Sequence, residues 1–376
     1  MTLCRVITEA GDLRGKRVLV RLDLNVPIVN GEIRDAFRIT QSLPTLTYLQ
    51  EQGAKTVIIA HIEGEGADTL KPVYGRLSLQ FPIVFKEKIE DVLEYEKTME
   101  DGSFVLMENI RHYEGEKKND EAFSKQLAEM GDIYVNDGFS VSHRPHASVV
   151  GIPAFLPSYV GFLMEKEIKN LSLVFSAPHP FLFILGGAKF STKMPLVEKF
   201  LTIADTIFIC GALGHDIFKA RGYNVGKSLV AKEELDLSTY ITNPHIEVPS
   251  DVVVETEGVV SVKKPNELGE TDSMRDSGPE TIEHLKKLIS EAKCVLWNGP
   301  LGEYERNFST GTEEVAKAIA ETKTLSIVGG GDTLAVVDKL GITDKFTFVS
   351  SGGGAMLDFL ANGTLPGLKA IEEGKK

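Results

Sequence analysis

Cysteine is scarce in this sequence, and its scarcity excludes two kinds of protein. Among 376 residues there are three cysteines, Cys4, Cys210 and Cys294, and no two of them form a C-x-x-C pair. An odd number of widely spaced thiols indicates neither a disulfide framework nor a zinc site. The pattern favours a reducing compartment, and we expect a cytoplasmic protein.

Long hydrophobic runs and excess positive charge are also lacking. No stretch approaches the 18 or so apolar residues that a membrane-spanning helix requires, and residues 1–6 form no apolar signal segment. Lys and Arg total 41 against 54 Asp and Glu, so the formal net charge is −13. The sequence therefore predicts a soluble protein with no membrane partner and no nucleic-acid partner.

Two common nucleotide-binding signatures are missing. No G-x-G-x-x-G follows a predicted strand, which removes the usual fingerprint of a nucleotide-dependent dehydrogenase. The segment Gly226-Lys227-Ser228 resembles the end of a P-loop, but that pattern needs glycine five residues before Gly226, where Arg221 stands. Any nucleotide must therefore be bound in another way.

Short apolar runs alternate with longer amphipathic segments along the whole chain. This order is typical of parallel sheets flanked by helices, and the length suits two domains of roughly 100–200 residues. We predict an α/β fold of two doubly wound, Rossmann-like parallel sheets. The predicted strands cover 17–20, 55–60, 103–107 and 132–135 in the first half, then 180–185, 206–209, 294–297, 325–328 and 346–349 in the second.

A helix is predicted between the two halves. Apolar residues from Val160 to Leu171 have helical spacing and follow the proline-marked stretch Pro153 to Pro157. We interpret residues 159–172 as an interdomain helix, with one domain over residues 1–158 and the other over 173–362. The C-terminal tail, residues 363–376, is expected to pack back on the first domain.

Glycine-rich segments follow the predicted strands of the second half. They are Gly186-Gly187-Ala188-Lys189, Asn298-Gly299-Pro300, Gly329 to Thr333, and Ser350 to Gly354. Open α/β sheets bind ligands beyond the carboxyl ends of their strands, and glycine before a helix lets the backbone approach a phosphate. Asp332 could hold the hard cation that accompanies a nucleotide. Any single run could instead be an ordinary helix start.

Arginine, histidine and carboxamide residues follow the predicted strands of the first half. They lie in Arg21 to Asn25, at His61, in Glu108 to Arg111, and in Asn136 to His146. Guanidinium groups suit a small molecule that bears carboxylate or phosphate. Two structural alternatives stay open: Arg38 could pair with Asp35 at helical spacing, and Arg21 could hold Asp23.

The histidines of the last of these segments are not spaced as metal ligands. His143 and His146 flank Arg144 without a cysteine or a second carboxylate at ligand spacing. We expect them to hydrogen-bond an anion.

The segment Arg21 to Pro27 resembles the signature of phosphoglycerate kinases. Further segments resemble motifs of that family in the family's order: Asp35 to Arg38, Leu43 to Thr45, Glu108 to Arg111, Asn136 to His146, Gly186 to Lys193, Asp276 to Thr281, Trp297 to Glu305, Gly329 to Thr333, and Ser351 to Ala355. The resemblance covers essentially the whole chain. It implies a monomeric, hinge-bending glycolytic enzyme that exchanges a phosphoryl group between 1,3-bisphosphoglycerate and Mg-ADP, giving 3-phosphoglycerate and Mg-ATP.

The resemblance also implies roles for single residues. The first domain would bind the glycerate substrate through Asp23, Leu24, Asn25, Arg38, His61, Arg111 and Arg144. The second would bind the nucleotide through Gly186, Gly187, Lys193, Asn298, Pro300, Glu305, Gly330, Gly331, Asp332 and Thr333, with Asp332 contacting Mg²⁺. The catalytic residues would be Arg38, Lys189, Lys193 and Gly331. Phosphoryl transfer asks mainly for alignment and charge stabilisation, which such groups supply.

One loop departs from the family's usual Ser-His-Leu-Gly-Arg-Pro. The chain has Ala60-His61-Ile62-Glu63-Gly64-Glu65-Gly66, which keeps the histidine, loses the arginine and adds two carboxylates. Either this loop turns away from the anionic substrate, or another cation such as Lys71 or Arg76 compensates, or the protein binds glycerate weakly. The alternative function is therefore a catalytically impaired paralogue that still binds nucleotide or glycerate.

A second departure lies near the expected floor of the nucleotide site. The chain has Ala212-Leu213-Gly214-His215-Asp216 where the family usually has a sequence like Ala-Met-Ala-Tyr-Thr. It bears on adenine contacts rather than on catalysis.

Overall fold

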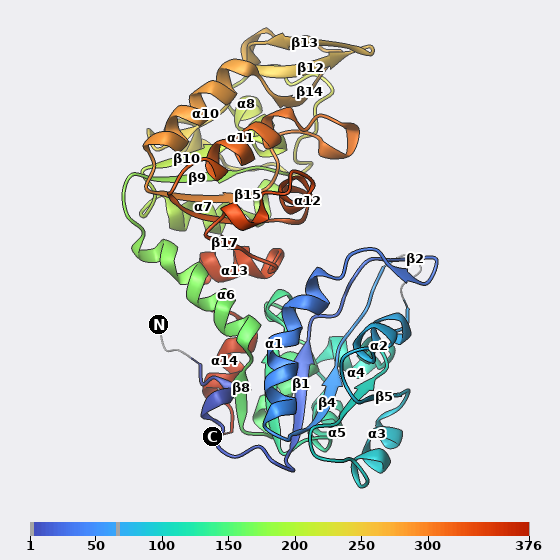
Figure 1. Ribbon diagram of the computed structural model, residues 1–376. Helices are drawn as coiled ribbons and strands as arrows, with labels where there is room; N and C mark the ends of the chain where they lie inside the picture. The colour runs from blue at the N-terminus through green and yellow to red at the C-terminus, as the bar shows by residue number, and fades with distance from the viewer. Residues whose placement is uncertain (1–3, 65–67, 376) are drawn as a thin grey trace. The chain divides into compact units, whose positions relative to one another are not determined.

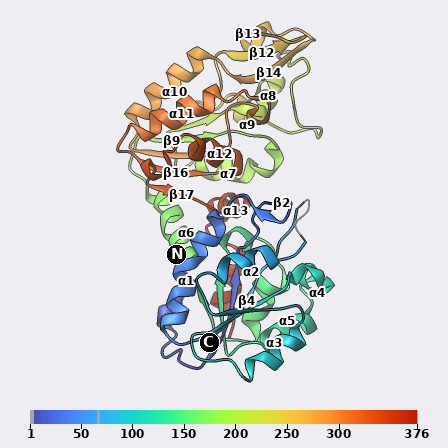
Figure 2. The ribbon, with the colours of Figure 1, turned by 45° about the vertical axis from the view of Figure 1, so that its right-hand side comes forward.

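The computed structural model describes residues 4–64 and 68–375. These residues form two compact units, which are described separately (Figures 1 and 2). The first unit contains the chain up to Lys169 together with Asn362 onward, and the second unit runs from Asn170 to Ala361. Each unit has its own six-stranded parallel sheet, which confirms the predicted fold class. Within the described residues, no helix is long and apolar enough to cross a membrane.

The first unit is built on a parallel sheet with the order β5-β6-β4-β1-β7-β8. Its strands are β1 (Arg17–Leu22), β2 (Ile28–Val29), β3 (Glu32–Ile33), β4 (Lys55–Ile59), β5 (Ile83–Lys86), β6 (Phe104–Met107), β7 (Ile133–Asp137) and β8 (Ser158–Val160), of which β2 and β3 form a separate hairpin. Its helices are α1 (Phe37–Glu51), α2 (Lys71–Leu77), α3 (Ile89–Glu96), α4 (Glu114–Lys118), α5 (Glu121–Ala128) and α14 (Pro366–Glu373), and α6 (Phe162–Ser172) begins in it.

Both faces of this sheet are buried. Val18, Val20 and Leu22 of β1 share one core with residues of α1 and α2. Leu19 points the other way, into a core shared with α3 and α5. Because successive strand residues face opposite sides and both sides are covered, the central strands are continuous apolar runs.

The second unit repeats this architecture with the sheet order β11-β10-β9-β15-β16-β17. Its strands are β9 (Phe181–Leu185), β10 (Thr206–Ile209), β11 (Ile246–Glu247), β12 (Val252–Thr256), β13 (Val259–Lys263), β14 (Asp272–Ser277), β15 (Cys294–Asn298), β16 (Leu325–Gly329) and β17 (Phe348–Val349). Its helices are α7 (Met194–Phe200), α8 (Gly211–Ala220), α9 (Ser238–Ile241), α10 (Pro279–Glu291), α11 (Thr310–Ala320), α12 (Gly331–Lys339) and α13 (Gly354–Asn362), the last of which ends in the first unit.

Helices cover both faces of the second sheet as well. Leu182 and Ile184 pack in a core with residues of α10 and α11, which lie side by side in Figure 1. On the opposite face, the ring of Phe183 lies 5.0 Å from the ring of Phe200 on α7. The strands β12, β13 and β14 form a separate antiparallel sheet, which the sequence pattern did not predict.

The predicted strands all occur, but the interdomain helix begins later than expected. Tyr159 and Val160 belong to β8, which pairs with β7, and α6 starts only at Phe162. The carboxylate of Asp137 at the end of β7 accepts a hydrogen bond from the backbone N–H of Met164 at 3.0 Å. This contact fixes the first turn of α6, where the helix has unpaired N–H groups.

Candidate active site

Four neighbouring strands of the first unit bring their carboxyl ends to one edge of the sheet. The strands β6, β4, β1 and β7 are adjacent and parallel, and the polar residues predicted for the site follow them. His61, just after β4, is buried. Its pKa is held far below the ordinary value by burial and by the nearby guanidinium groups of Arg21, Arg111, Arg144 and Arg38. Four arginines therefore gather around one neutral imidazole.

Arg21 orients His61. Its Nη2 lies 3.0 Å from Nδ1 of His61. Because guanidinium only donates, Nδ1 accepts and the imidazole proton lies on Nε2, where it can be donated. Arg21 also donates to Oγ of Ser148 at 3.0 Å, and Ser148 in turn donates its backbone N–H to the buried Glu116 at 2.9 Å. The alternative that Arg21 holds Asp23 is supported by charge attraction alone, because the hydrogen bonds of Arg21 go to Ser148, to His61 and to the carbonyl of Leu22.

Arg38 pairs with Asp23 and not with Asp35. Nη1 of Arg38 donates to Oδ1 of Asp23 at 3.0 Å and to the carbonyl of Asn25 at 3.2 Å. Asp35 instead accepts the backbone N–H of Phe37 at 2.7 Å, at the start of α1. The alternative of a simple helical ion pair is therefore wrong. Arg38 is held over the end of β1 with a third of its side chain, 33%, still exposed.

Leu24 and Asn25 follow Asp23 but point to different places. The side chain of Leu24 is fully buried in the core of the first unit, so only its backbone can meet a ligand. Oδ1 of Asn25 accepts the backbone N–H of Glu63 at 2.9 Å. The end of β1 is thereby connected to the loop that departs from the family pattern.

Glu63 lies against the basic residues. Its carboxylate forms an ion pair with the guanidinium of Arg111, and Oε1 lies 2.9 Å from Nζ of Lys117. The loop therefore does not turn away at Glu63. Lys117 pairs with Glu63, and Lys71, one of the two expected compensating cations, pairs with Glu87 at 2.9 Å. Glu65 and Gly66 lie outside the described residues.

The guanidinium of Arg111 is almost fully buried. Its side chain is 5% exposed, and burial together with Arg144 and Arg21 lowers its pKa to about 10. Apart from the ion pair with Glu63, none of its Nε, Nη1 and Nη2 atoms has a hydrogen-bond partner among residues 4–64 and 68–375. A buried guanidinium left in this way is suited to an incoming anion.

His146 is neutral and its ring nitrogen lies 3.9 Å from a carboxylate oxygen of Glu116. Burial and the nearby Arg111 and Arg144 lower its pKa to about 4. In the part of the chain that the structure describes, no group of three or more His, Cys, Asp or Glu side chains is arranged to hold a metal ion.

In the second unit, β9 and β15 are neighbours at the point where the strand order reverses. The backbone N–H of Gly186 donates to the carbonyl of Asn298 at 2.8 Å, and that of Gly187 to the carbonyl of Pro300 at 3.1 Å. A Cβ atom on Gly186 would lie 2.2 Å from the Pro300 carbonyl oxygen, so only glycine fits there. Open α/β sheets bind their ligands at such reversal points.

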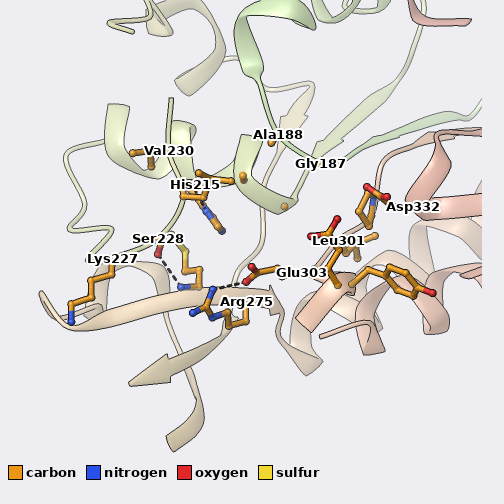
Figure 3. A pocket seen from close by; sticks show the side chains of 18 residues that line it. Gly187, Ala188, His215, Lys227, Ser228, Val230, Arg275, Leu301, Glu303 and Asp332 are labelled. Carbon is orange, nitrogen blue, oxygen red and sulfur yellow. Dashed lines mark hydrogen bonds and ion pairs between the residues drawn. The ribbon is translucent and has the colours of Figure 1, made fainter. Parts of the chain in front are cut away.

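Two adjoining hollows open at this reversal point. The smaller, of about 260 Å³, is lined by Lys193, Asn298, Gly330, Gly331 and other residues, and the larger, of about 580 Å³, by His215, Arg275, Glu303, Glu305 and others. Both are lined by Gly187, Pro300 and Asp332. Figure 3 shows His215 pointing from α8 toward Arg275 and Glu303 across the larger hollow.

Lys193 and the start of α12 supply positive charge to the smaller hollow. Nζ of the buried Lys193 donates to the carbonyl of Gly186 at 2.6 Å. Burial lowers its pKa to about 8, against the opposing effects of Cys210 and Asp332. Helix α12 begins at Gly331, after Gly330 with φ 102°, and its first N–H groups have no intrahelical partners.

Asp332 and Thr333 lie in the first turn of α12. Asp332 is exposed and lines both hollows. Thr333 is buried, and its Oγ1 has no hydrogen-bond partner among the described residues. Lys189 is exposed and is not among the residues that line either hollow. The second unit therefore gathers most of the expected nucleotide residues but leaves Lys189 at the surface.

Sequence reasoning missed part of the wall of the larger hollow. Arg275 on β14 forms ion pairs with Glu255 at 2.9 Å and with Glu303. The sequence analysis selected residues that follow predicted strands. Because the sheet of β12, β13 and β14 was not predicted, Arg275 was not among them. In the first unit, Lys117 and Glu116 were missed for a different reason, since they stand in a charged run, Glu114 to Lys118, that looks like an ordinary solvated helix face.

The second sequence departure lies on α8. His215 donates from Nδ1 to the carbonyl of Leu229 at 2.9 Å, and burial lowers its pKa to about 4. Asp216 is buried and accepts the backbone N–H of Ala231 at 2.8 Å. Ala212 and His215 of this segment line the larger hollow, whereas the smaller hollow, with Lys193 and the start of α12, is lined by none of residues 212–216.

Comparison with known proteins gives one family along the whole chain. A family model of phosphoglycerate kinase matches residues 7–363. A phosphoglycerate kinase of Thermosipho africanus is 42% identical, covering 97% of this chain and 97% of the relative. Another, of Dictyoglomus turgidum, is 41% identical, covering 96% and 97%.

Solved structures agree. A phosphoglycerate kinase from Coxiella burnetii has a TM-score of 0.85 at 34% identity, covering 99% of this chain and 100% of that one. One from Pyrococcus horikoshii has a TM-score of 0.84 at 31% identity, covering 98% of each. These full-length matches give no support to the alternative of a catalytically impaired paralogue. With its strand-end arginines, its glycine turns and relatives alike from end to end, the chain belongs to the phosphoglycerate kinase family.

Proposed function

We propose that the first unit binds the glycerate substrate and the second binds the nucleotide while a phosphoryl group passes reversibly from 1,3-bisphosphoglycerate to ADP, giving 3-phosphoglycerate and ATP. The chain is a phosphotransferase of glycolysis, as its family is. The observation that carries the assignment to units is the contrast between their strand ends. One unit gathers guanidinium groups around His61, and the other gathers glycine turns and a helix start around two hollows.

On the glycerate side, we assign the anionic groups of the substrate to Arg111 and Arg144. The buried nitrogens of Arg111, which have no partner other than Glu63 among the described residues, support this role. His61 would donate from Nε2, while Asp23, Asn25 and the backbone of Leu24 would meet the hydroxyl and carboxyl groups. Arg38, anchored by Asp23 yet partly exposed, is assigned to the transferring phosphoryl group.

On the nucleotide side, we assign base and ribose to the larger hollow and phosphates to the smaller one. The larger has room for a nucleoside and is lined by Pro300 and Glu305. The smaller offers Lys193, Asn298 and the start of α12 at Gly330 and Gly331. Gly186 and Gly187 would let the nucleotide approach the backbone, and Thr333 would support the phosphate loop from below.

Asp332 fits the Mg²⁺ that accompanies the nucleotide. It is a single exposed carboxylate at the border of both hollows. Mg²⁺ is commonly held by one or two carboxylates together with substrate phosphates, so a lone carboxylate is sufficient. The ion would neutralise phosphate charge, and Lys193 together with the N–H groups of α12 would hold the remaining oxygens.

The chemistry requires positive charge and alignment rather than a proton acceptor. The attacking oxygen is already ionised in either direction, so no general base is needed. We assign Arg38, Lys189, Lys193 and the N–H of Gly331 to charge stabilisation of the moving group. Because the two substrates are assigned to separate units, transfer requires the units to close, and α6 is the hinge in this proposal.

We further propose a monomer in the cytoplasm that takes small molecules alone as partners. The net charge of −13 supports the absence of nucleic-acid and anionic-membrane binding. The whole proposal is tested by following ATP formation from 1,3-bisphosphoglycerate and Mg-ADP in a coupled assay. We expect turnover that depends on both substrates and on Mg²⁺. No turnover at saturating substrates would refute it.

A further inference from the structure

Glu63 occupies the buried guanidinium of Arg111 in the first unit. Its carboxylate pairs with Arg111 on one side and with Lys117 on the other. Two of the other arginines around His61 are engaged elsewhere: Arg21 by Ser148 and His61, and Arg38 by Asp23. The charged partner of Arg111 is thus a side chain of the protein itself.

This contact is built into the fold. The side chain of Asn109 donates to the carbonyl of Ile62 at 2.8 Å and accepts the backbone N–H of Arg111 at 3.1 Å. Asn25 holds the backbone N–H of Glu63 at 2.9 Å. One asparagine therefore fixes the residue before Glu63 and the backbone of Arg111 together, so that Glu63 and Arg111 are held face to face by backbone contacts.

A carboxylate and a phosphate use a guanidinium in the same way. Both accept two parallel N–H bonds from the planar fork, so they exclude each other at one arginine. The Glu63 side chain is 50% exposed, whereas that of Arg111 is 5% exposed. Glu63 can therefore return to water at small cost when another anion arrives, while Arg111 cannot leave.

We propose that Glu63 is an internal competitor for the phosphorylated substrate and sets the affinity of the first unit for it. In the absence of substrate, its carboxylate neutralises Arg111 and Lys117, and the substrate's phosphate or carboxylate displaces it. The identity of the displacing ligand rests on the proposed function. Glu63 is in this sense a specificity-determining residue, because a ligand reaches Arg111 only when its anionic groups bind there more tightly than the Glu63 carboxylate does.

The test compares binding of 3-phosphoglycerate by calorimetry in the wild type, Glu63→Gln and Glu63→Gly. The second variant restores the residue that the family has at this place. The matched control is Glu87→Gln, which removes the same charge from an exposed ion pair with Lys71. Thermal unfolding of each variant establishes that it is folded, and KM values for 3-phosphoglycerate and for ATP are measured in the ATP-consuming direction.

We expect both Glu63 variants to bind 3-phosphoglycerate about threefold to tenfold more tightly than the wild type, as about 0.7–1.4 kcal/mol of competing ion pair would give. KM for ATP and affinity in the Glu87→Gln control should not change. Equal or weaker binding by the Glu63 variants would overturn the inference.

Failure of this inference differs from failure of the proposed function. If the wild type turns over and the Glu63 variants bind like it, only the competitor role is wrong. If neither the wild type nor the variants bind 3-phosphoglycerate or turn over, both are wrong. Binding by the variants but not by the wild type would support the inference in its strongest form.

Discussion

Arg38 and Asp23 form an ion pair at 2.9 Å although they come from different elements, one from α1 and the other from the end of β1. Asp23 is almost fully buried, and it also accepts hydrogen bonds from the backbone N–H of Asn25 at 3.2 Å and from the hydroxyl of Ser140. The carboxylate is therefore an anchor. It fixes one edge of the guanidinium and leaves the rest free for a ligand.

Replacing Arg38 by Ala should lower turnover far more than nucleotide affinity. The assigned role of Arg38 is to stabilise charge on the moving group, and loss of one such donor costs roughly 100- to 1,000-fold in kcat. The affinity for ADP, a ligand assigned to the other unit, should stay within about twofold when measured by calorimetry. Arg38→Lys should recover little, because Lys lacks the planar fork. Equal losses in kcat and in ADP affinity would contradict the role.

Lys193 should make nucleotide affinity fall as the pH rises through 8. Burial lowers its pKa to about 8, so the ammonium is charged below that pH and neutral above it. Since the charged form attracts phosphate, affinity for ADP should decrease by up to about tenfold per pH unit above pH 8. Below pH 8 the ammonium is already charged, so affinity should level off.

The measurement is calorimetry of ADP binding at about pH 8.5 in buffers of different ionisation enthalpy. The wild type should take up a fraction of a proton per nucleotide bound, and Lys193→Gln should take up none. Exposed Lys199→Gln on α7 is the control and should behave like the wild type. Proton uptake that persists in Lys193→Gln would assign the effect to another group.

Asp137 should make the protein lose stability as the pH rises toward 7. Burial raises the pKa of its carboxyl from 3.8 to about 7, so the folded state holds the proton more tightly than the unfolded state. Between these values the folded state binds more protons, and the free energy of unfolding falls as the pH rises. Asp137→Asn keeps an oxygen for the Met164 N–H and removes the titration.

The free energy of unfolding of Asp137→Asn relative to the wild type should therefore rise between about pH 4 and pH 7, by roughly 1–3 kcal/mol. Urea unfolding at several pH values measures it. For the surface variant Asp101→Asn, the free energy of unfolding should change with pH in the same way as for the wild type. A pH-independent difference for Asp137→Asn would mean that this carboxyl does not titrate in the window.

Gly186 should tolerate no side chain. A methyl group there would lie 2.2 Å from the carbonyl oxygen of Pro300, so β9 and β15 would have to separate. We expect Gly186→Ala to destabilise the second unit by about 1–3 kcal/mol and to weaken ADP binding.

Gly331→Ala is the folding control, because a Cβ atom there meets nothing within 4 Å. The buried Trp297, the one tryptophan of the sequence, reports unfolding of this unit by fluorescence. Equal unfolding midpoints for the two variants would contradict the close approach.

The strands could be predicted from sequence because their signal is local. Residues such as Val18 to Val20 and Phe181 to Leu185 are buried on both faces, so each strand is an apolar run that can be recognised alone. Short or edge strands carry no such run. The edge strand β5 is only partly buried, and β13 exposes most of its residues, so neither could be distinguished from a loop.

The site was predictable to a different degree in each unit. Glycines such as Gly186 and Gly330 stand directly after strands, and their effect on the backbone does not depend on distant partners. Their position at the site could therefore be predicted from the order of strands and glycines in the sequence. Arg275 and Lys117 were missed because they reach their sites from a small sheet and from a short charged helix.

By itself, the sequence determined the α/β class, the parallel sheets and the residues that stand at the strand ends, because hydrophobic periodicity and glycine turns act over a few neighbouring residues. Only the tertiary structure decided which charges meet. Arg38 forms an ion pair with Asp23 and not with Asp35. Glu63 forms ion pairs with Arg111 and Lys117, which are 48 and 54 positions away in the sequence. Ion pairs depend on distance in space and on burial, and the sheet order that sets both is absent from any local pattern.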